Sequence, residues 1–348
     1  MSSHHPNGQA DIAVYIGNGQ SGDIHVLRLS VGDGKLSLVQ RQPFPGLEEP
    51  GRSLPLALSP GREFLYAAMR GTPRGIASFS IDPSTGALSA LGFAAMAESV
   101  AYIHTDRSGR FLFGASYDGN LVTVGPIGPD GMAQDVTQRV ATAPHAHGIM
   151  SDPANRRVLA TSLGGDLVYS FDFDHVGGAL AQPRTTSLPK GTGPRHFVFD
   201  PNGRYLYLLG ELDASITVFE YDAEKGTLHS KQSVSTLPAG FDGAAWGSDI
   251  HITPDGRFLY ASERRSSALA SFGVETDGRL RPLQNVPTET QPRGFGIDPT
   301  GRYLLALGQL TDHVTVYAID GADGALSMTD RIAVGSGPDW VEMVELES

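Results

Sequence analysis

The stretch GTGPRHFVFDPNGRYLYLLGELDAS, residues 191–215, has the pattern of a complete β-hairpin. Two mainly apolar runs flank DPNG, whose Asn and Gly suit the φ > 0 positions of tight turns. Antiparallel pairing across a turn near residue 202 places Arg195 opposite residues 209–211. We therefore expect Arg195 and Glu211 to be neighbours at the open end of this hairpin.

This hairpin pattern recurs along the chain. The copies are SPGREFLY (59–66), DRSGRFLF (106–113), DPANRRVL (152–159), DPNGRYLY (200–207), TPDGRFLY (253–260) and DPTGRYLL (298–305), with a shortened copy, DIAVY, at 11–15. Their last residues follow one another at intervals of 45 to 53 residues. A period of this length with β patterning and turn residues indicates a β-propeller.

Each repeat divides into four strands, which in residues 195–235 are HFVFD, YLYLLG, SITVFEYD and TLHSKQSVS. The first copy lacks its own first strand, and GPDWVEM near the C-terminus matches GPRHFVF. We therefore predict an all-β, seven-bladed β-propeller of four-stranded antiparallel blades, formed by residues 1–348 as one domain. The C-terminal strand is expected to join the N-terminal blade and close the ring. Residues 1–10 are expected to be a disordered tail.

Composition narrows the classes of function. The net charge of -12 argues against nucleic acid or an anionic membrane surface as a partner, because both require a large basic face. The chain has no Cys, which excludes disulfides and thiolate catalysis. No signal peptide or membrane-spanning run is recognisable, so we expect a cytoplasmic protein. A closed ring of strands can stand alone, and a monomer is the simplest expectation.

Equivalent positions of the repeats form two predicted rings at one mouth of the propeller. One ring lies twelve residues before the end of each copy and the other four residues after it. The polar members of the two rings are Arg70, Tyr117, His147, Arg195, Glu211, Arg264, Arg293 and Asp339. Other polar or aromatic residues lie nearby in sequence, namely His145, His196, Trp246, Asp249 and His251.

These ring residues allow more than one interpretation. A lone Arg–Glu pair on a hairpin is usually a weak surface salt bridge. Four arginines around one mouth repel one another, however, and favour an anionic ligand. His145 and His147 could belong to a metal site, but no third ligand is evident, so we expect neither metal nor cofactor. His251 lies deeper in its strand and is equally compatible with a hydrogen-bonded core histidine.

Several segments resemble the seven-bladed lactonase family, and the similarity spans essentially the whole chain. They are the opening stretch extended to 222, WGSDIHITPDGRFLYASER (246–264), TETQPRGFGIDPTGRYLLALGQ (288–309) and VGSGPDW (334–340). The resemblance implies an enzyme that hydrolyses a sugar-acid lactone, with 6-phosphoglucono-1,5-lactone as the leading substrate. It points to a catalytic cluster of His147, Arg195, Glu211 and Arg264. Tyr102 departs from the histidine that phosphogluconolactonases of this family carry there, which leaves the exact lactone open.

The leading mechanistic hypothesis is a metal-free hydrolase. Glu211 or His147 would act as the general base, and Arg195 and Arg264 would stabilise the oxyanion. Substrate-binding roles are expected for Arg70, Tyr117, His145, His196, Asp249, His251 and Arg293. Three alternatives stay open: hydrolysis of an unphosphorylated sugar or aldaric acid lactone, a cycloisomerase of the carboxy-muconate type, and a non-catalytic propeller that serves as a binding scaffold.

Overall fold

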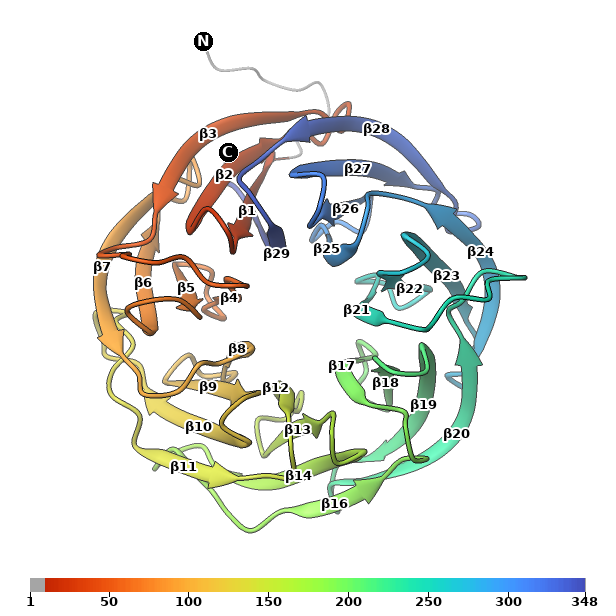
Figure 1. Ribbon diagram of the computed structural model, residues 1–348, viewed down its shortest axis with the longest axis horizontal. Coiled ribbons are helices and arrows are strands. Elements are labelled where there is room, and N and C mark those ends of the chain that lie inside the picture. The colour runs from red at the N-terminus through yellow and green to blue at the C-terminus, as the bar shows by residue number, and fades with distance from the viewer. Residues whose placement is uncertain (1–9, 348) are drawn as a thin grey trace.

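The computed structural model describes residues 10–347, and these residues form seven antiparallel sheets arranged around a common axis (Figure 1). The predicted all-β, seven-bladed propeller is confirmed. Six blades have four strands, and in the fourth blade the outermost strand is split into β15 and β16, which both pair with β14. The expected disordered tail at 1–10 falls, apart from residue 10, outside the described residues.

The strands follow one another from the axis outward in every blade except the first. The first blade contains β29 (Pro338–Glu345), β1 (Ile12–Asn18), β2 (Asp23–Leu29) and β3 (Leu36–Pro43). The second contains β4 (Leu56–Leu58), β5 (Phe64–Met69), β6 (Gly75–Ile81) and β7 (Leu88–Ala95). The third contains β8 (Tyr102–Thr105), β9 (Phe111–Ser116), β10 (Leu121–Pro126) and β11 (Gln138–Ala141).

The other four blades repeat this order. The fourth contains β12 (Ala146–Ser151), β13 (Arg157–Ser162), β14 (Leu167–Asp174), β15 (Ala179–Leu180) and β16 (Arg184–Ser187). The fifth contains β17 (Pro194–Phe199), β18 (Tyr205–Gly210), β19 (Ser215–Asp222) and β20 (Thr227–Ser235). The sixth contains β21 (Gly247–Ile252), β22 (Phe258–Glu263), β23 (Ala268–Val274) and β24 (Leu280–Pro287). The seventh contains β25 (Pro292–Ile297), β26 (Tyr303–Gly308), β27 (His313–Ile319) and β28 (Leu326–Ala333).

The C-terminal strand closes the ring as predicted. β29 is the innermost strand of the first blade and pairs antiparallel with β1, with Ile12 opposite Glu345. Beside this junction, the backbone N–H of Leu346 donates a hydrogen bond to the carbonyl of Asp11 at 2.9 Å. The first blade is therefore built from both ends of the described chain.

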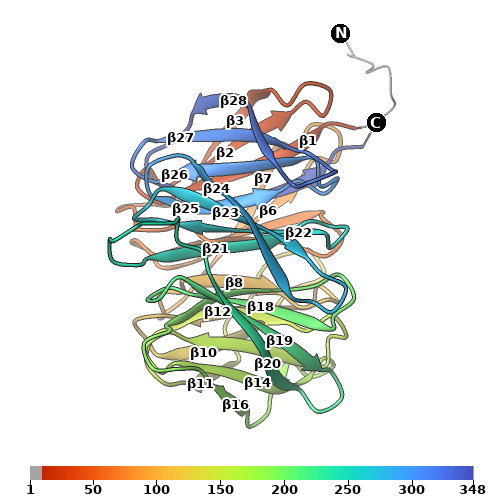
Figure 2. The ribbon, with the colours of Figure 1, turned by 90° about the vertical axis from the view of Figure 1, so that its right-hand side faces the viewer.

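The core lies between neighbouring blades. The second strand of each blade is almost wholly buried, whereas outer strands such as β20 expose about every other residue. Three of the aligned tyrosines reach across to the next blade, where the hydroxyls of Tyr15, Tyr207 and Tyr260 donate to backbone carbonyls at 2.8–3.0 Å. The repeat therefore preserves an interblade contact as well as a strand pattern. The outer strands β20, β24 and β28 run obliquely across the rim (Figure 2), as the twist of β-sheets requires.

Each innermost strand of the fourth to seventh blades carries a β-bulge near its start. The pairing register shifts between 146 and 149, 194 and 196, 247 and 250, and 292 and 295. A bulge changes the direction of side chains locally and often lies beside a functional site. His147, Arg195, Ser248 and Arg293 all lie within these bulges, at one end of the axis.

Candidate active site

A pocket of about 790 Å³ opens where the innermost strands begin. We call it the arginine pocket, and the residues that line it are Glu49, Pro50, Gly51, Arg52, Arg70, Gly71, Thr72, Arg74, Ser99, Tyr117, Asp118, His147, Arg195, Glu211, Trp246, Arg264 and Arg293. This lining contains six arginines against three carboxylates. The pocket is therefore positive although the protein as a whole carries a net charge of -12.

Glu211 lies between two arginines. Its Oε2 accepts hydrogen bonds from Arg195 Nε at 2.9 Å and from Arg264 Nη2 at 2.8 Å. Burial opposes ionisation of Glu211, but the charges of Arg195 and Arg264 outweigh burial and hold its pKa below the usual value. The predicted contact between Arg195 and Glu211 is present, and a second guanidinium shares the same carboxylate oxygen.

Arg264 is held against the pocket wall by Trp246. The centre of its guanidinium lies 4.0 Å from the centroid of the Trp246 ring, and Arg265 lies at 4.8 Å from the same centroid. Arg264 Nη2 also donates to the carbonyl of Gly247 at 2.9 Å. Such cation–π contacts fix a planar guanidinium more rigidly than one ion pair alone.

His147 is neutral at physiological pH. Burial, followed by the positive charge of Arg195, holds its pKa well below the usual value. Its Nδ1 is buried without a hydrogen-bond partner among residues 10–347, although its ring lies near those of Tyr117 (centroids 6.0 Å apart) and His196 (5.0 Å). A neutral imidazole that lines a pocket without a protein partner can accept a proton there.

A second group of arginines lines the side of the pocket nearest the second blade. Arg70 Nε donates to Ser99 Oγ at 3.2 Å, and Arg293 Nη1 donates to the carbonyl of Arg52 at 3.1 Å. Arg293 also lies 3.8 Å from the buried carboxylate of Asp339. Burial raises the pKa of Asp339, and the charge of Arg293 only partly opposes this rise. Arg70 Nη2 lies 3.4 Å from Asp118 Oδ2, so each of these two arginines has one carboxylate neighbour.

The structure brings most of the predicted site residues together. The pocket lining includes Arg70, Tyr117, His147, Arg195, Glu211, Arg264 and Arg293. His145 stacks on the outer side of this group against the Tyr117 ring, with centroids 4.2 Å apart. It is not among the lining residues of the pocket.

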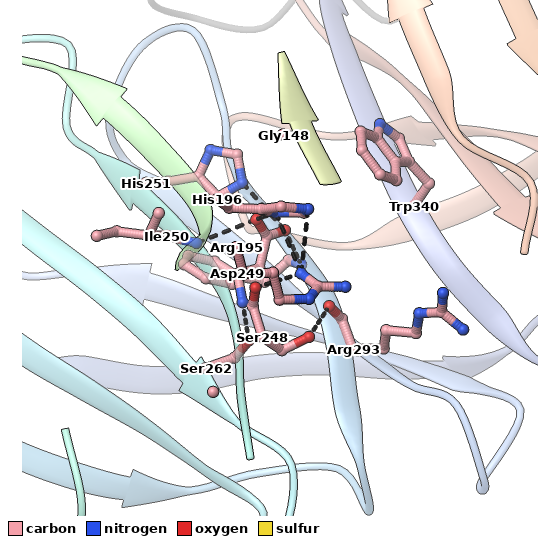
Figure 3. Close-up of polar contacts among 12 residues, drawn as sticks. Gly148, Arg195, His196, Ser248, Asp249, Ile250, His251, Ser262, Arg293 and Trp340 are labelled. Carbon is pink, nitrogen blue, oxygen red and sulfur yellow. Dashed lines mark hydrogen bonds and ion pairs between the residues drawn. The ribbon is translucent and has the colours of Figure 1, made fainter. Parts of the chain in front are cut away.

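The other three predicted residues lie deeper along the axis. The His196 ring lies against the guanidinium of Arg195, and its Nδ1 donates to Asp249 Oδ1 at 2.8 Å (Figure 3). Asp249 and His251 line a separate cavity of about 360 Å³ near the turns that end the innermost strands. We call it the opposite cavity, since its lining also includes residues of those turns, such as Pro60 and Pro299.

Sequence reasoning missed two arginines of the pocket, Arg52 and Arg74. Both are exposed and lie in loops of the second blade, outside the positions that the repeat makes equivalent. The only available signal was the density of arginines between residues 52 and 74, which an exposed loop also explains.

Within residues 10–347, no three His, Asp or Glu side chains come together in a group that could hold a metal ion. Over the same range, no helix has the length and apolar character needed to cross a membrane.

A closed ring of seven blades with a positively charged pocket at one mouth defines a β-propeller with a candidate anion-binding site. The family described as lactonase, 7-bladed beta-propeller, matches residues 12–343, and the chain belongs to this family. The chain is 40% identical over 337 residues to a 6-phosphogluconolactonase of Pectobacterium carotovorum, with 96% of this chain and 99% of the relative covered. It is 41% identical over 330 residues to a 6-phosphogluconolactonase of Klebsiella pneumoniae, with 94% and 97% covered.

Solved structures show the same fold. A periplasmic gluconolactonase of Pseudomonas aeruginosa superimposes with a TM-score of 0.87 at 27% identity, covering 97% of this chain and all of that one. A protein from Lactobacillus plantarum superimposes with a TM-score of 0.86 at 29% identity, covering 96% of this chain and all of that one.

Proposed function

We propose that this lactonase-family enzyme hydrolyses 6-phosphoglucono-1,5-lactone to 6-phosphogluconate in the arginine pocket. The observation that carries the proposal is the excess of arginines over carboxylates in the pocket of an acidic protein. The names of the relatives that match nearly the full chain support the phosphorylated lactone. Such a ligand has an ester carbonyl at one end and a dianionic phosphate at the other.

The structure supports His147 as the general base in this proposal. Its imidazole is neutral and has no protein partner in the described chain, so it can take a proton from the attacking water. Glu211 is a weaker base because one oxygen is shared by two guanidiniums. An anionic substrate would offset the arginine charges around His147 and thereby increase its basicity. The imidazolium could then protonate the alkoxide that leaves when the ring opens.

Arg195 and Arg264 would stabilise the oxyanion of the tetrahedral intermediate. Their Nε and Nη contacts with Glu211 and with backbone carbonyls fix both planes before substrate binds. Preorganised donors of this kind contribute about 3–4 kcal/mol each when they face the developing charge. The proposed chemistry uses side chains alone.

Arg70 and Arg293 would bind the distal phosphate. A guanidinium offers paired N–H donors that match two phosphate oxygens, and both arginines line the arginine pocket. Arg52 and Arg74 extend the positive charge of this pocket toward solvent.

A second candidate is an unphosphorylated lactone. The structural neighbour from Pseudomonas aeruginosa is named a gluconolactonase, and it shares the fold over nearly the whole chain. In this case the arginines of the second blade would bind hydroxyl groups or the carboxylate of an aldaric acid lactone.

Proton release with a pH indicator would test both candidates. The assay compares 6-phosphoglucono-1,5-lactone, glucono-1,5-lactone and an aldaric acid lactone, each corrected for spontaneous opening. We expect the highest kcat/KM for the phosphorylated lactone. A higher kcat/KM for glucono-1,5-lactone or for the aldaric acid lactone would instead identify that class of lactone as the substrate. No acceleration of any lactone would overturn hydrolysis and direct the search to muconate cycloisomerisation and to binding partners.

One variant tests whether Arg293 binds the phosphate group of the lactone. Arg293→Gln is expected to lower kcat/KM for the phosphorylated lactone by about 10- to 100-fold, because it removes a charge-assisted contact. Its effect on glucono-1,5-lactone should stay within threefold. Arg281→Gln is the matched control, because Arg281 forms an exposed ion pair with Glu275 on the outer strand β24. An equal loss with both lactones would contradict the phosphate role of Arg293.

A further inference from the structure

We propose that Asp249, through His196, is a positioning residue that holds the guanidinium of Arg195 in the orientation required at the arginine pocket. The proposal rests on the proposed role of Arg195 at the lactone carbonyl. It gives Asp249 and His196 a function other than the substrate binding expected from sequence.

Arg195 as a residue is only 2% exposed, and its guanidinium is fixed on three sides. Nε donates to Glu211, and Nη1 donates to the carbonyl of Ser248. Nη1 also lies 3.2 Å and 3.1 Å from the two ring nitrogens of His196 (Figure 3). Nearly equal distances to both nitrogens place Nη1 over the imidazole ring rather than in its plane. Among the described residues, Nη2 alone has no protein acceptor, which leaves it for substrate.

The guanidinium of Arg195 therefore packs on the ring of His196, and Asp249 sets the orientation of that ring. The imidazole is 4% exposed, and its Nδ1 donates to Asp249 Oδ1 at 2.8 Å. The Tyr102 ring contacts it edge to face, with centroids 4.9 Å apart. The hydrogen bond to Asp249 fixes both the tautomer and the ring orientation, as a carboxylate does for other functional histidines.

Asp249 is itself immobilised. Its Oδ1 accepts the backbone N–H of Ile250 at 3.0 Å, and its Oδ2 accepts the backbone N–H of Phe295 and a ring N–H of His251, both at 3.3 Å. Its own backbone N–H donates to Ser262 Oγ at 3.1 Å. These contacts join β21, β22 and β25, so three strands determine where the carboxylate lies.

The charges of the group are consistent with this role. Burial and the positive charge of Arg195 lower the pKa of His196 to about 4, so the ring beneath the guanidinium is neutral. Burial opposes ionisation of Asp249, but His251 and His196 hold its pKa well below the usual value. A neutral ring can receive a guanidinium over its face, whereas an imidazolium would repel it.

Asp249 cannot act on the lactone directly. It lines the opposite cavity and is absent from the lining of the arginine pocket. The route through His196 and Arg195 predicts that substitutions at Asp249 and Arg195 are coupled, which makes the proposal testable.

The test begins with single variants assayed on the lactone that the wild-type enzyme hydrolyses best. Asp249→Asn, His196→Asn and His196→Phe each remove part of the contact that holds Arg195. At position 196, Asn keeps an N–H donor for Asp249 but lacks the ring, whereas Phe keeps a ring but lacks the donor. We expect kcat to fall by about 10- to 100-fold in each, with KM within threefold of wild type. Glu342→Gln is the matched control, because Glu342 is a carboxylate of the same cavity that accepts from Trp340 Nε1 at 3.2 Å. It should keep kcat within threefold.

A double-variant cycle with Arg195→Lys separates positioning from general damage to the fold. If Asp249 acts through Arg195, adding Asp249→Asn to Arg195→Lys should lower kcat by less than threefold further. A full additional loss, or a wild-type kcat for Asp249→Asn alone, would overturn the proposal.

A second readout does not depend on turnover. The Nε–H proton of Arg195 should give an NMR signal that exchanges slowly and disappears in Arg195→Lys. We expect Asp249→Asn to accelerate its exchange at least tenfold and Glu342→Gln to leave it unchanged. An unchanged signal in Asp249→Asn would overturn the positioning role. Absence of turnover by the wild-type enzyme, with a signal that still responds to Asp249→Asn, would overturn the proposed function and retain the positioning role.

Discussion

His147 and Glu211 are both placed to accept a proton, and their surroundings separate their roles. The carboxylate is already shared between Arg195 and Arg264, whereas the imidazole has no protein partner among the described residues. Proton acceptance by Glu211 would weaken the contacts that hold both arginines in place. Proton acceptance by His147 would break none of these hydrogen bonds, and an anionic substrate would offset the repulsion between the imidazolium and Arg195. These contacts support the imidazole as the base.

We therefore expect His147→Gln to lower kcat by about 10²- to 10⁴-fold, the usual contribution of a general base. KM should change by less than about threefold, because the arginines that bind the anion are unaffected. Steady-state kinetics on the best lactone would measure both values. His145→Gln is the matched control: this ring stacks on Tyr117 outside the pocket lining. A kcat for His147→Gln above one tenth of wild type would assign the base elsewhere.

The pH dependence of kcat/KM follows from the same residue. Burial and Arg195 hold the pKa of His147 below the ordinary value of 6.5, so the free imidazole is already neutral at that pH. Activity should therefore be level from about pH 6.5 to 8 and fall only when acid protonates the ring at lower pH. Stopped-flow proton release, corrected for spontaneous opening, would give the profile. An acid limb centred above pH 6.5 would contradict a base with a lowered pKa.

The sequence was sufficient to predict some of these residues and insufficient for others. Arg195 and Glu211 could be paired because hairpin register places them together whatever surrounds them. Asp249 follows Ser248 directly, and spacing alone could not show that it would face the opposite cavity. The bulge between Gly247 and Ile250 interrupts the alternation that would otherwise indicate a side chain's direction.

At the level of elements, the strands themselves were predictable, because alternation and turn residues mark them clearly. The predicted strands of 195–235 correspond to β17, β18, β19 and β20 within a residue or two. The close approach of neighbouring blades was not predictable, since it depends on which residues of different blades meet. Gly148 on β12 is one such point, because it faces the backbone carbonyl of Arg195 on β17. The same carbonyl accepts a hydrogen bond from Thr161 Oγ1 at 2.8 Å.

Gly148→Ala tests whether this approach positions the catalytic arginine. A Cβ on residue 148 would lie 2.6 Å from the carbonyl oxygen of Arg195, so one of the two strands must shift. We expect a loss of about 1–3 kcal/mol in the free energy of unfolding, as for other overpacked cores. We also expect a fall in kcat of at least tenfold, because β12 carries His147 and β17 carries Arg195. Urea unfolding and steady-state kinetics would measure the two effects.

Gly321→Ala provides the control for that experiment. No atom lies within 4 Å of the position that its Cβ would occupy, in the exposed turn between β27 and β28. Its unfolding free energy should stay within about 0.5 kcal/mol of wild type. Wild-type kcat and stability in Gly148→Ala would show that the strands absorb the methyl group without moving the site.

For the whole molecule, closure of the ring depends on one strand from the C-terminus. β29 supplies the inner edge of the first blade, and its Val341 and Met343 pack in the same core cluster as Tyr303 and Leu305 of the seventh blade. It therefore joins the first and last blades through side chains as well as through the ladder with β1. It also carries Asp339, the carboxylate near Arg293.

Ending the chain at Gly337 should consequently abolish cooperative folding rather than remove a local contribution. The truncated chain would expose the β1 edge and the apolar face between the first and seventh blades, and we expect aggregation or loss of a single thermal transition. A circular permutant of residues 10–347 provides the control, in which residues 347 and 10 are joined by a short glycine linker and new ends open at Gly321. Because the backbones of Leu346 and Asp11 are already hydrogen-bonded, this permutant should keep its Tm within about 2 °C, a change of order 1 kcal/mol. Differential scanning calorimetry would compare the two proteins. A truncated chain with a single transition near the wild-type Tm would show that packing between blades closes the ring without β29.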